Sequence, residues 1–251
     1  MTKLYKKSEI WFSVIWIVVY VVGASLTDTF SSMLGVEKCL TLPFLVVMSA
    51  VLTIWIFKNK LNDKYGLCKT DVDLKYFLYF LPLLVLISVN FWFGVNVSLS
   101  IVEVILFIFS MILVGYLEEI IFRGLLFKAM AKDSLKWAIV VSSLTFGIGH
   151  IVNLISSGGE HLVANLCQIV YATAVGFLFV IMFHRGKTLI PCIVAHSLVN
   201  ATSVFQGERG MDDINQIISA VVIVVVAVLY ALFIIKFMPK KEEALEVKSE
   251  E

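Results

Sequence analysis

The sequence is poor in charged residues and lacks paired cysteines, glycine-rich phosphate loops and basic arms. Only 16% of its 251 residues are charged, whereas 60% are hydrophobic and the mean hydropathy is +0.95. A soluble domain of this length needs far more polar surface to remain in solution. The composition therefore excludes an ordinary soluble domain and predicts that the excess apolar side chains face lipid.

The cysteines and the net charge exclude two further kinds of site. The four cysteines lie far apart without a Cys-x-x-Cys pair, at Cys39, Cys68, Cys167 and Cys192. This spacing indicates neither a disulfide framework nor a cysteine zinc site, and packing in apolar helices is the simplest role. The net charge of +1 and the missing phosphate loop give no indication of a nucleic-acid partner.

Eight stretches are long and apolar enough to cross a bilayer, for which a helix needs about 20 residues. They are roughly Ile10–Phe30, Leu40–Phe57, Tyr76–Phe93, Leu99–Met130, Trp137–Ile155, Leu162–Phe183, Leu189–Phe205 and Ile214–Met238. Lysines precede the first stretch, as in a secretory signal, but its apolar run exceeds the roughly 7–15 residues of a signal. We therefore expect it to be a retained helix.

The positively charged residues distinguish the two sides of the predicted bundle. Most lysines and arginines fall at the termini and in alternate connections, whereas the other connections carry Lys38 and Arg209. Positive residues in short connections mark the cytoplasmic side. We therefore predict an all-α, polytopic membrane protein with both termini cytoplasmic. Residues 1–251 are predicted to form a single domain that ends in a charged cytoplasmic tail over 240–251.

Polar residues interrupt three of these apolar stretches. An ionisable residue at bilayer depth costs at least ~2.5–3.5 kcal/mol on insertion scales, so it normally faces a cavity or a partner. Six polar residues lie in the fourth, fifth and seventh stretches: Glu118, Glu119, Arg123, His150, His196 and Asn200.

The spacing of these residues predicts which of them share a helix face. Glu119 and Arg123 are four residues apart, so they share a helix face and can form an ion pair. His196 and Asn200 are also four residues apart, so their side chains point the same way. Glu118 lies about 100° around the helix and stays free of the ion pair. Counted from the flanking lysines at ~1.5 Å per residue, the three helices can meet at one cavity that opens toward the cytoplasm.

This set of groups is suited to the hydrolysis of a peptide bond. A carboxylate in a water-poor pocket can act as the general base that activates water, and a nearby histidine can share that water. A second histidine and an amide can donate hydrogen bonds to the oxyanion of a tetrahedral intermediate. The pair of Glu119 and Arg123 would position the glutamate helix and compensate one buried charge.

Three motifs in this order resemble a known family. Glu-Glu-x-x-x-Arg, Phe-x-x-x-His and His-x-x-x-Asn span residues 118–200 within a motif-bearing core of about 100–205, and they resemble the CPBP family. That family comprises CAAX prenyl endopeptidases and bacteriocin-processing or immunity proteins, also called Abi proteins. The resemblance implies an all-helical intramembrane endopeptidase, and the compact size of the chain suggests a bacterial member in the plasma membrane. In such an endopeptidase Glu118 activates water with His150, while His196 and Asn200 form the oxyanion hole.

The resemblance leaves the role of a metal open. Glu118, His150 and His196 could hold zinc with one open position. A metal-free mechanism is favoured because Asn200 makes sense as a hydrogen-bond donor and little sense as a zinc ligand. No other cofactor is expected.

Other intramembrane proteases are disfavoured by missing motifs. The sequence has no His-Glu-x-x-His, which a helical zinc protease would carry. Gly23-Ala24-Ser25-Leu26 lacks the glycine that would follow a rhomboid-type serine, and no pair of intramembrane aspartates occurs.

The expected substrate is a membrane-embedded, lipidated or hydrophobic peptide or protein that is cut near the cytoplasmic side. Prenylated proteins and small peptides such as pheromones or bacteriocin precursors are examples within the family. The main alternative is a non-proteolytic immunity protein or scaffold that binds another membrane protein, such as a sensor kinase or transporter. A small-molecule transporter has no internal repeat to support it. The motif set favours the enzyme, because a scaffold has no need for an unpaired Glu118 beside two histidines.

Overall fold

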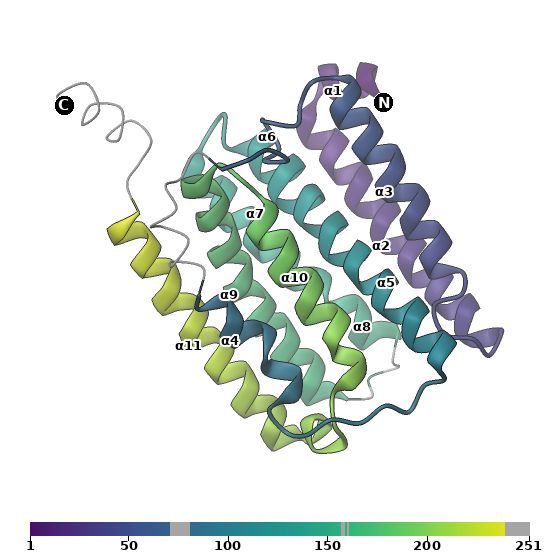
Figure 1. Cartoon of the computed structure of the whole chain (residues 1–251). Coiled ribbons are helices and arrows are strands. Elements are labelled where there is room, and N and C mark those ends of the chain that lie inside the picture. Colours follow the sequence, from purple (N-terminus) through teal and green to yellow (C-terminus); the bar gives the residue numbers. More distant parts are fainter. Residues whose placement is uncertain (71–80, 157–158, 160, 239–251) are drawn as a thin grey trace.

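The computed structural model describes residues 1–70, 81–156, 159 and 161–238 (Figure 1). Their regular structure is helical, and Val95 and Gln206 form one isolated antiparallel bridge. The elements in chain order are α1 (Thr2–Lys7), α2 (Glu9–Met33), α3 (Thr41–Lys58), α4 (Leu83–Ile87), η2 (Val89–Phe91), α5 (Ile101–Glu118), η3 (Glu119–Phe127), α6 (Lys128–Met130), α7 (Leu135–Gly149), α8 (Ile151–Ser156), α9 (Leu162–Gly186), α10 (Ile190–Thr202), η4 (Ser203–Phe205), η5 (Glu208–Met211) and α11 (Asp213–Phe237). The predicted all-α class is confirmed.

Six of the eight predicted spans are confirmed as helices long and apolar enough to cross a membrane. They are α2, α3, the continuous run Ile101–Met130, the run Leu135–Ile155, α9 and α11. The predicted seventh span is helical but shorter, over Ile190–Phe205. The predicted third span and the charged tail lie partly or wholly outside the described residues, which leaves the count of eight and the sidedness as predictions.

The side chains of α2 show why this bundle requires a lipid environment. Phe12, Trp16 and Tyr20 recur every four residues and are buried, whereas Val18 and Val22 on the other side are 54% and 51% exposed. In water, such contiguous apolar exposure along a whole helix would favour aggregation. In a bilayer the outer face contacts acyl chains, so one buried stripe is enough to attach α2 to the bundle.

Backbone hydrogen bonds attach the connections to opposite ends of α10. At one end the Leu189 amide donates to the Gly66 carbonyl at 2.9 Å, and Gly66 has a φ of +70°. At the other end the Gly207 amide donates to the Gly94 carbonyl at 3.1 Å. The chain therefore passes from one end of α10 to the other between Gly66 and Gly94.

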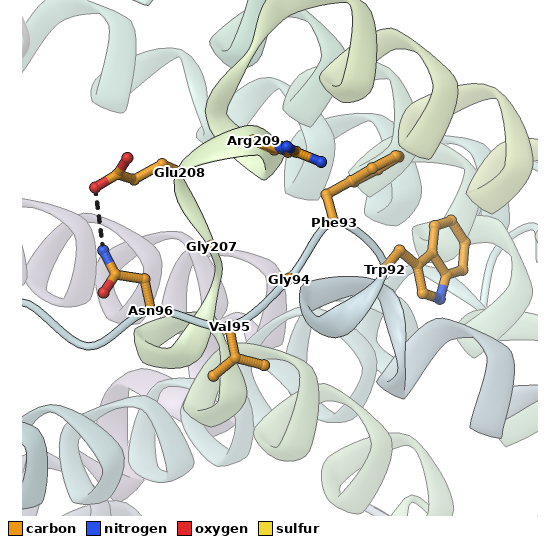
Figure 2. Close-up of a pocket in the computed structure, with 8 residues that line it drawn as sticks. All are labelled: Trp92, Phe93, Gly94, Val95, Asn96, Gly207, Glu208 and Arg209. Carbon is orange, nitrogen blue, oxygen red and sulfur yellow. Dashed lines mark hydrogen bonds between the residues drawn. The ribbon is translucent and has the colours of Figure 1, made fainter.

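The second of these attachments forms the rim of an open pocket. Figure 2 shows the segments 92–96 and 207–209 around it, with the Asn96 amide 3.4 Å from Oε1 of Glu208. None of the six polar residues singled out by the sequence lines this pocket. The chemistry predicted above must therefore be sought elsewhere in the bundle.

Candidate active site

The helix that carries both glutamates changes its winding between them. α5 ends at Glu118, and η3 continues it as a π-helix whose nine residues, Glu119 to Phe127, are all buried. π-helical turns are rare, usually last a single turn and are frequent at functional sites. Here the change of winding coincides with two neighbouring carboxylates that both contact one histidine.

Close packing of α5 against α10 brings that histidine to the glutamates. A Cβ atom on Gly115 would lie 2.6 Å from the backbone nitrogen of Ser197, so only glycine allows the two helices to approach this closely. The Ser197 hydroxyl donates to the Ile112 carbonyl at 3.0 Å across the same contact. Small residues at such crossings are a common feature of membrane helix pairs. His196 consequently lies directly beside Glu118 and Glu119.

His196 lies between the two carboxylates. Its Nδ1 is 2.8 Å from Oε1 of Glu119, and its Nε2 is 3.3 Å from Oε2 of Glu118. Glu118 is buried, with 8% of the residue exposed, and its other oxygen accepts a hydrogen bond of 2.7 Å from the Tyr20 hydroxyl. Its Oε2 has no hydrogen-bond partner among the described residues, because the contact with His196 is close without being a well-formed hydrogen bond.

The predicted ion pair between Glu119 and Arg123 forms inside the bundle. Nη1 of Arg123 donates to Oε1 of Glu119 at 3.0 Å, and both side chains are completely buried. The guanidinium lies 4.0 Å from the centre of the Phe146 ring, and Nε and Nη2 have no hydrogen-bond partner among the described residues. We name Tyr20, Glu118, Glu119, Arg123 and His196 together the Glu118 cluster.

Phe146 also connects His150 to the Glu118 cluster. The rings of His150 and His196 pack edge-on against Phe146, with centroid distances of 5.3 and 5.6 Å. His150 lies at the break between α7 and α8 and is half-buried, within electrostatic reach of Glu118 and Arg123. The two imidazoles therefore pack against the same aromatic ring from different helices.

Asn200 lies one turn beyond His196 on α10 and is half-buried. Within the described part of the chain, neither its amide nor the imidazole of His150 has a hydrogen-bond partner. Both groups are thus free to bind a substrate or a water molecule.

The sequence did not indicate two features of this site. Glu118 is free of the ion pair as predicted, but it is hydrogen-bonded to Tyr20, which belongs to no motif. His196 contacts Glu119 as well as Glu118, although the α-helical spacing predicts that these glutamates point about 100° apart. The one signal for Tyr20 was its place on the aromatic stripe of α2, which marks burial and says nothing about a partner.

Glu118, His150 and His196 are the residues that could hold zinc if a metal were bound. Among the described residues no three His, Cys, Asp or Glu side chains form a group that could hold a metal ion. One oxygen of Glu118 is hydrogen-bonded to Tyr20 and one nitrogen of His196 to Glu119. The set Glu118, His150 and His196 is therefore not arranged as a zinc site, and no step below involves a metal.

A comparison with protein families places this geometry in context. The family model of the "Type II CAAX prenyl endopeptidase Rce1-like" proteins matches residues 98–202. The match covers less than half of the chain, so it shows a similarity to this family over that segment. The matched segment runs from just before α5 to the end of α10 and includes Glu118, His150 and His196, whereas Tyr20 lies outside it.

One curated relative also matches part of the chain. Over 97 residues the chain is 34% identical to YdiL of Bacillus subtilis (strain 168), which is provisionally described as a membrane peptidase. The alignment covers 38% of this chain and 34% of YdiL, so the match spans about a third of that relative's length. Six helices are long and apolar enough to span a bilayer, and this relative is described as a membrane peptidase, so the chain is an integral membrane protein.

Proposed function

We propose that this protein is an intramembrane endopeptidase that hydrolyses a peptide bond in a membrane-associated, lipidated or hydrophobic substrate. The observation that carries the proposal is the state of Glu118. This carboxylate is buried within the membrane-spanning bundle. One oxygen accepts from Tyr20, and the other lies 3.3 Å from His196 with no hydrogen-bond partner in the described part of the chain. Burying a carboxylate oxygen without a partner costs free energy, so such an oxygen in a folded protein needs an explanation. A role in binding or catalysis supplies one.

In the proposed reaction, Oε2 of Glu118 takes a proton from a water molecule that His150 helps to orient. The hydroxide oxygen bonds to the carbonyl carbon of the substrate and forms a tetrahedral intermediate. The C–N bond then breaks as Glu118 returns its proton to the leaving nitrogen, which releases a carboxylate and an amine. Proton transfer by a positioned side chain typically contributes about 10²–10⁴-fold to the rate.

The contacts of His196 support its role as an oxyanion donor. Glu119 is paired with Arg123 and can only accept, so Nδ1–H of His196 donates to it. Nε2 carries a proton when the imidazole is positively charged, and it can then donate to the oxyanion together with the Asn200 amide. In that state the two carboxylates, the guanidinium and the imidazolium sum to zero charge, which limits the cost of burying them.

The position of the site supports a substrate that reaches it through the lipid. Glu118, His150 and His196 all lie on apolar helices. The family name suggests prenylated CAAX proteins as one class of substrate, and hydrophobic peptides without a lipid are the other. The catalytic roles, the substrate and the metal-free mechanism are all part of the proposal.

The first prediction concerns Glu118→Gln, which keeps the shape and removes the base. We expect turnover to fall by about 10²–10⁴-fold, while the thermal unfolding temperature of the purified protein is unchanged or slightly raised. The first substrates to assay are a farnesylated CAAX peptide and an unprenylated apolar peptide, each with the protein in liposomes. Peptides that accumulate in cells carrying the variant are then assayed as further candidate substrates. Repeating the assay with a chelator tests the metal-free mechanism, for which turnover should be unchanged.

Glu103→Gln is the matched control, because Glu103 lies on the same helix in an exposed capping box with Ser100. It should retain wild-type turnover. If a folded Glu118→Gln protein keeps full biological activity, the endopeptidase proposal is wrong. Activity that instead depends on a second membrane protein would support the scaffold or immunity alternative.

A further inference from the structure

The hydroxyl of Tyr20 donates to Oε1 of Glu118 at 2.7 Å, across a gap of 98 residues in the chain. Tyr20 lies in α2, and only 6% of the residue is exposed. Its helix lies outside the segment 98–202 that matches the family. A residue beyond that segment therefore makes direct contact with the carboxylate to which we assign the water-activating step.

The aromatic stripe of α2 fixes the position of this hydroxyl. Phe12 and Trp16 lie two turns and one turn before Tyr20 on the same buried face, and their rings pack edge to face at 6.2 Å. Phe12 also packs against Trp55 of α3 at 4.7 Å. Because this packing holds α2 against the bundle, the Tyr20 hydroxyl is already positioned next to Glu118.

This hydrogen bond makes the two oxygens of Glu118 different. A carboxylate accepts at both oxygens, and with Oε1 held by Tyr20 the free acceptor is Oε2. Rotation of the carboxylate would break a buried hydrogen bond, so Oε2 remains directed toward His196. A general base has to be held within hydrogen-bond reach of the proton it removes.

We propose that Tyr20 is a positioning residue, which holds Oε1 of Glu118 so that Oε2 is aimed at the water to be activated. This inference rests on the proposed function, because it assigns Tyr20 a role through Glu118. It also makes α2 a part of the active site, beyond its role in packing.

Two other tyrosines on membrane helices, one half-buried and one buried, provide matched controls. The hydroxyl of Tyr116 on α5 forms a hydrogen bond of 2.5 Å with Thr53 of α3 and does not contact Glu118. The hydroxyl of Tyr230 on α11 has no hydrogen-bond partner among the described residues. Replacement of either tyrosine by phenylalanine removes a hydroxyl from a membrane helix without touching the Glu118 cluster.

The test compares Tyr20→Phe with Tyr116→Phe and Tyr230→Phe in the purified full-length protein. We expect kcat of Tyr20→Phe to fall about 10- to 100-fold with KM changed less than about twofold, since misplacing a reacting group acts on the chemical step. Both controls should keep the wild-type kcat. The substrate is a peptide that wild type cleaves and Glu118→Gln does not.

A second measurement is independent of turnover. Thermal unfolding of Tyr20→Phe, Glu118→Gln and the double variant forms a cycle, and the effects should be non-additive because the residues share a hydrogen bond. Tyr116→Phe combined with Glu118→Gln should be additive.

The outcomes separate this inference from the proposed function. If Glu118→Gln abolishes turnover but Tyr20→Phe retains the wild-type kcat, the positioning role is wrong and the endopeptidase stands. If the thermal stability of Tyr20→Phe falls in parallel with its activity, Tyr20 has a structural role only and the inference is overturned. If Glu118→Gln is fully active, the proposed function fails first.

Discussion

The Glu118 cluster and a second group, the Glu9 cluster of Glu9, Lys64 and Lys132, each join distant segments through a glutamate. In the Glu9 cluster, Lys64 and Lys132 donate to the Glu9 carboxylate at 2.8 and 2.7 Å, and both of its oxygens have a partner. The side chains are partly exposed, at 19% for Glu9, 26% for Lys64 and 56% for Lys132.

The Glu118 cluster is deeper and less completely paired. Its two carboxylates and its guanidinium retain buried atoms without a hydrogen-bond partner among the described residues. The ion pairs alone explain why the charged residues of the Glu9 cluster lie together. Buried polar atoms without a partner, as in the Glu118 cluster, need a different explanation. The difference fits the proposal above, in which the Glu9 cluster stabilises the fold and the Glu118 cluster is arranged for an incoming water and substrate.

The largest effect on stability is expected from Arg123→Met. This change leaves Glu119 buried beside Glu118 without its cation, and breaking a buried pair from one side costs about 3–5 kcal/mol. The free energy of unfolding in detergent is the measurement. A loss below about 1 kcal/mol would contradict the compensating role of Arg123.

Arg185→Met is the control for the loss of a long cationic side chain. Arg185 donates to the Met238 and Ile235 carbonyls and ties α9 to α11, and it has no carboxylate partner among the residues that the structure describes. Its replacement leaves no unpaired buried charge, so we expect a smaller loss than for Arg123→Met.

A smaller effect is expected from Gly115→Ala, which tests whether the Glu118 cluster depends on the close approach of two helices. The new Cβ would lie 2.6 Å from the Ser197 backbone, so α5 and α10 must separate. Overpacking of this kind costs about 1–3 kcal/mol. A shift of about 1 Å between Glu118 and His196 can lower turnover by about 10²-fold.

Gly124→Ala on the same continuous helix is the matched control for that change. Its Cβ would meet its nearest neighbour at 3.6 Å, an ordinary contact, so stability and turnover should be unchanged. Equal effects of the two substitutions would show that helix winding, rather than the helix crossing, is what these glycines provide.

The parts of this architecture that depend on local spacing were predictable from the sequence. Runs of apolar residues were sufficient to locate α2, α3, α9 and α11 because a membrane helix is defined by length and hydropathy. The four-residue spacing of Glu119 and Arg123 was sufficient for their ion pair.

The parts that depend on long-range packing were not predictable in the same way. Tyr20 and Glu118 are 98 residues apart, and no periodicity relates them. The π-helix over Glu119–Phe127 departs from the 3.6-residue period on which the spacing argument rests, so the contact of Glu119 with His196 was missed. The catalytic roles came from resemblance to a family and stay predictions.

The smallest effect is expected in the Glu9 cluster, from Lys132→Met. The hydrogen bond to Glu9 raises the pKa of Lys132 above its usual range, despite the side chain's exposure. A raised pKa in the folded state means that the pair stabilises the protein below the unfolded value of about 10.4, and that this contribution is lost as pH rises through the folded value. Exposed pairs are worth about 0.2–1 kcal/mol, so the thermal shift should be small and should shrink in high salt.

Lys69→Met is the control for Lys132→Met, because Lys69 is exposed and has no ion pair among the described residues. The unfolding temperatures of Lys132→Met and wild type should differ at neutral pH and begin to converge as the pH rises above about 10.4, while turnover is unchanged throughout. A fall in turnover as large as that expected for Gly115→Ala would mean that the Glu9 cluster affects the site, and the contrast between the two clusters would then fail. Unchanged turnover would support the proposal that catalysis is confined to the deeper cluster, whose carboxylates keep oxygens without a partner among the described residues.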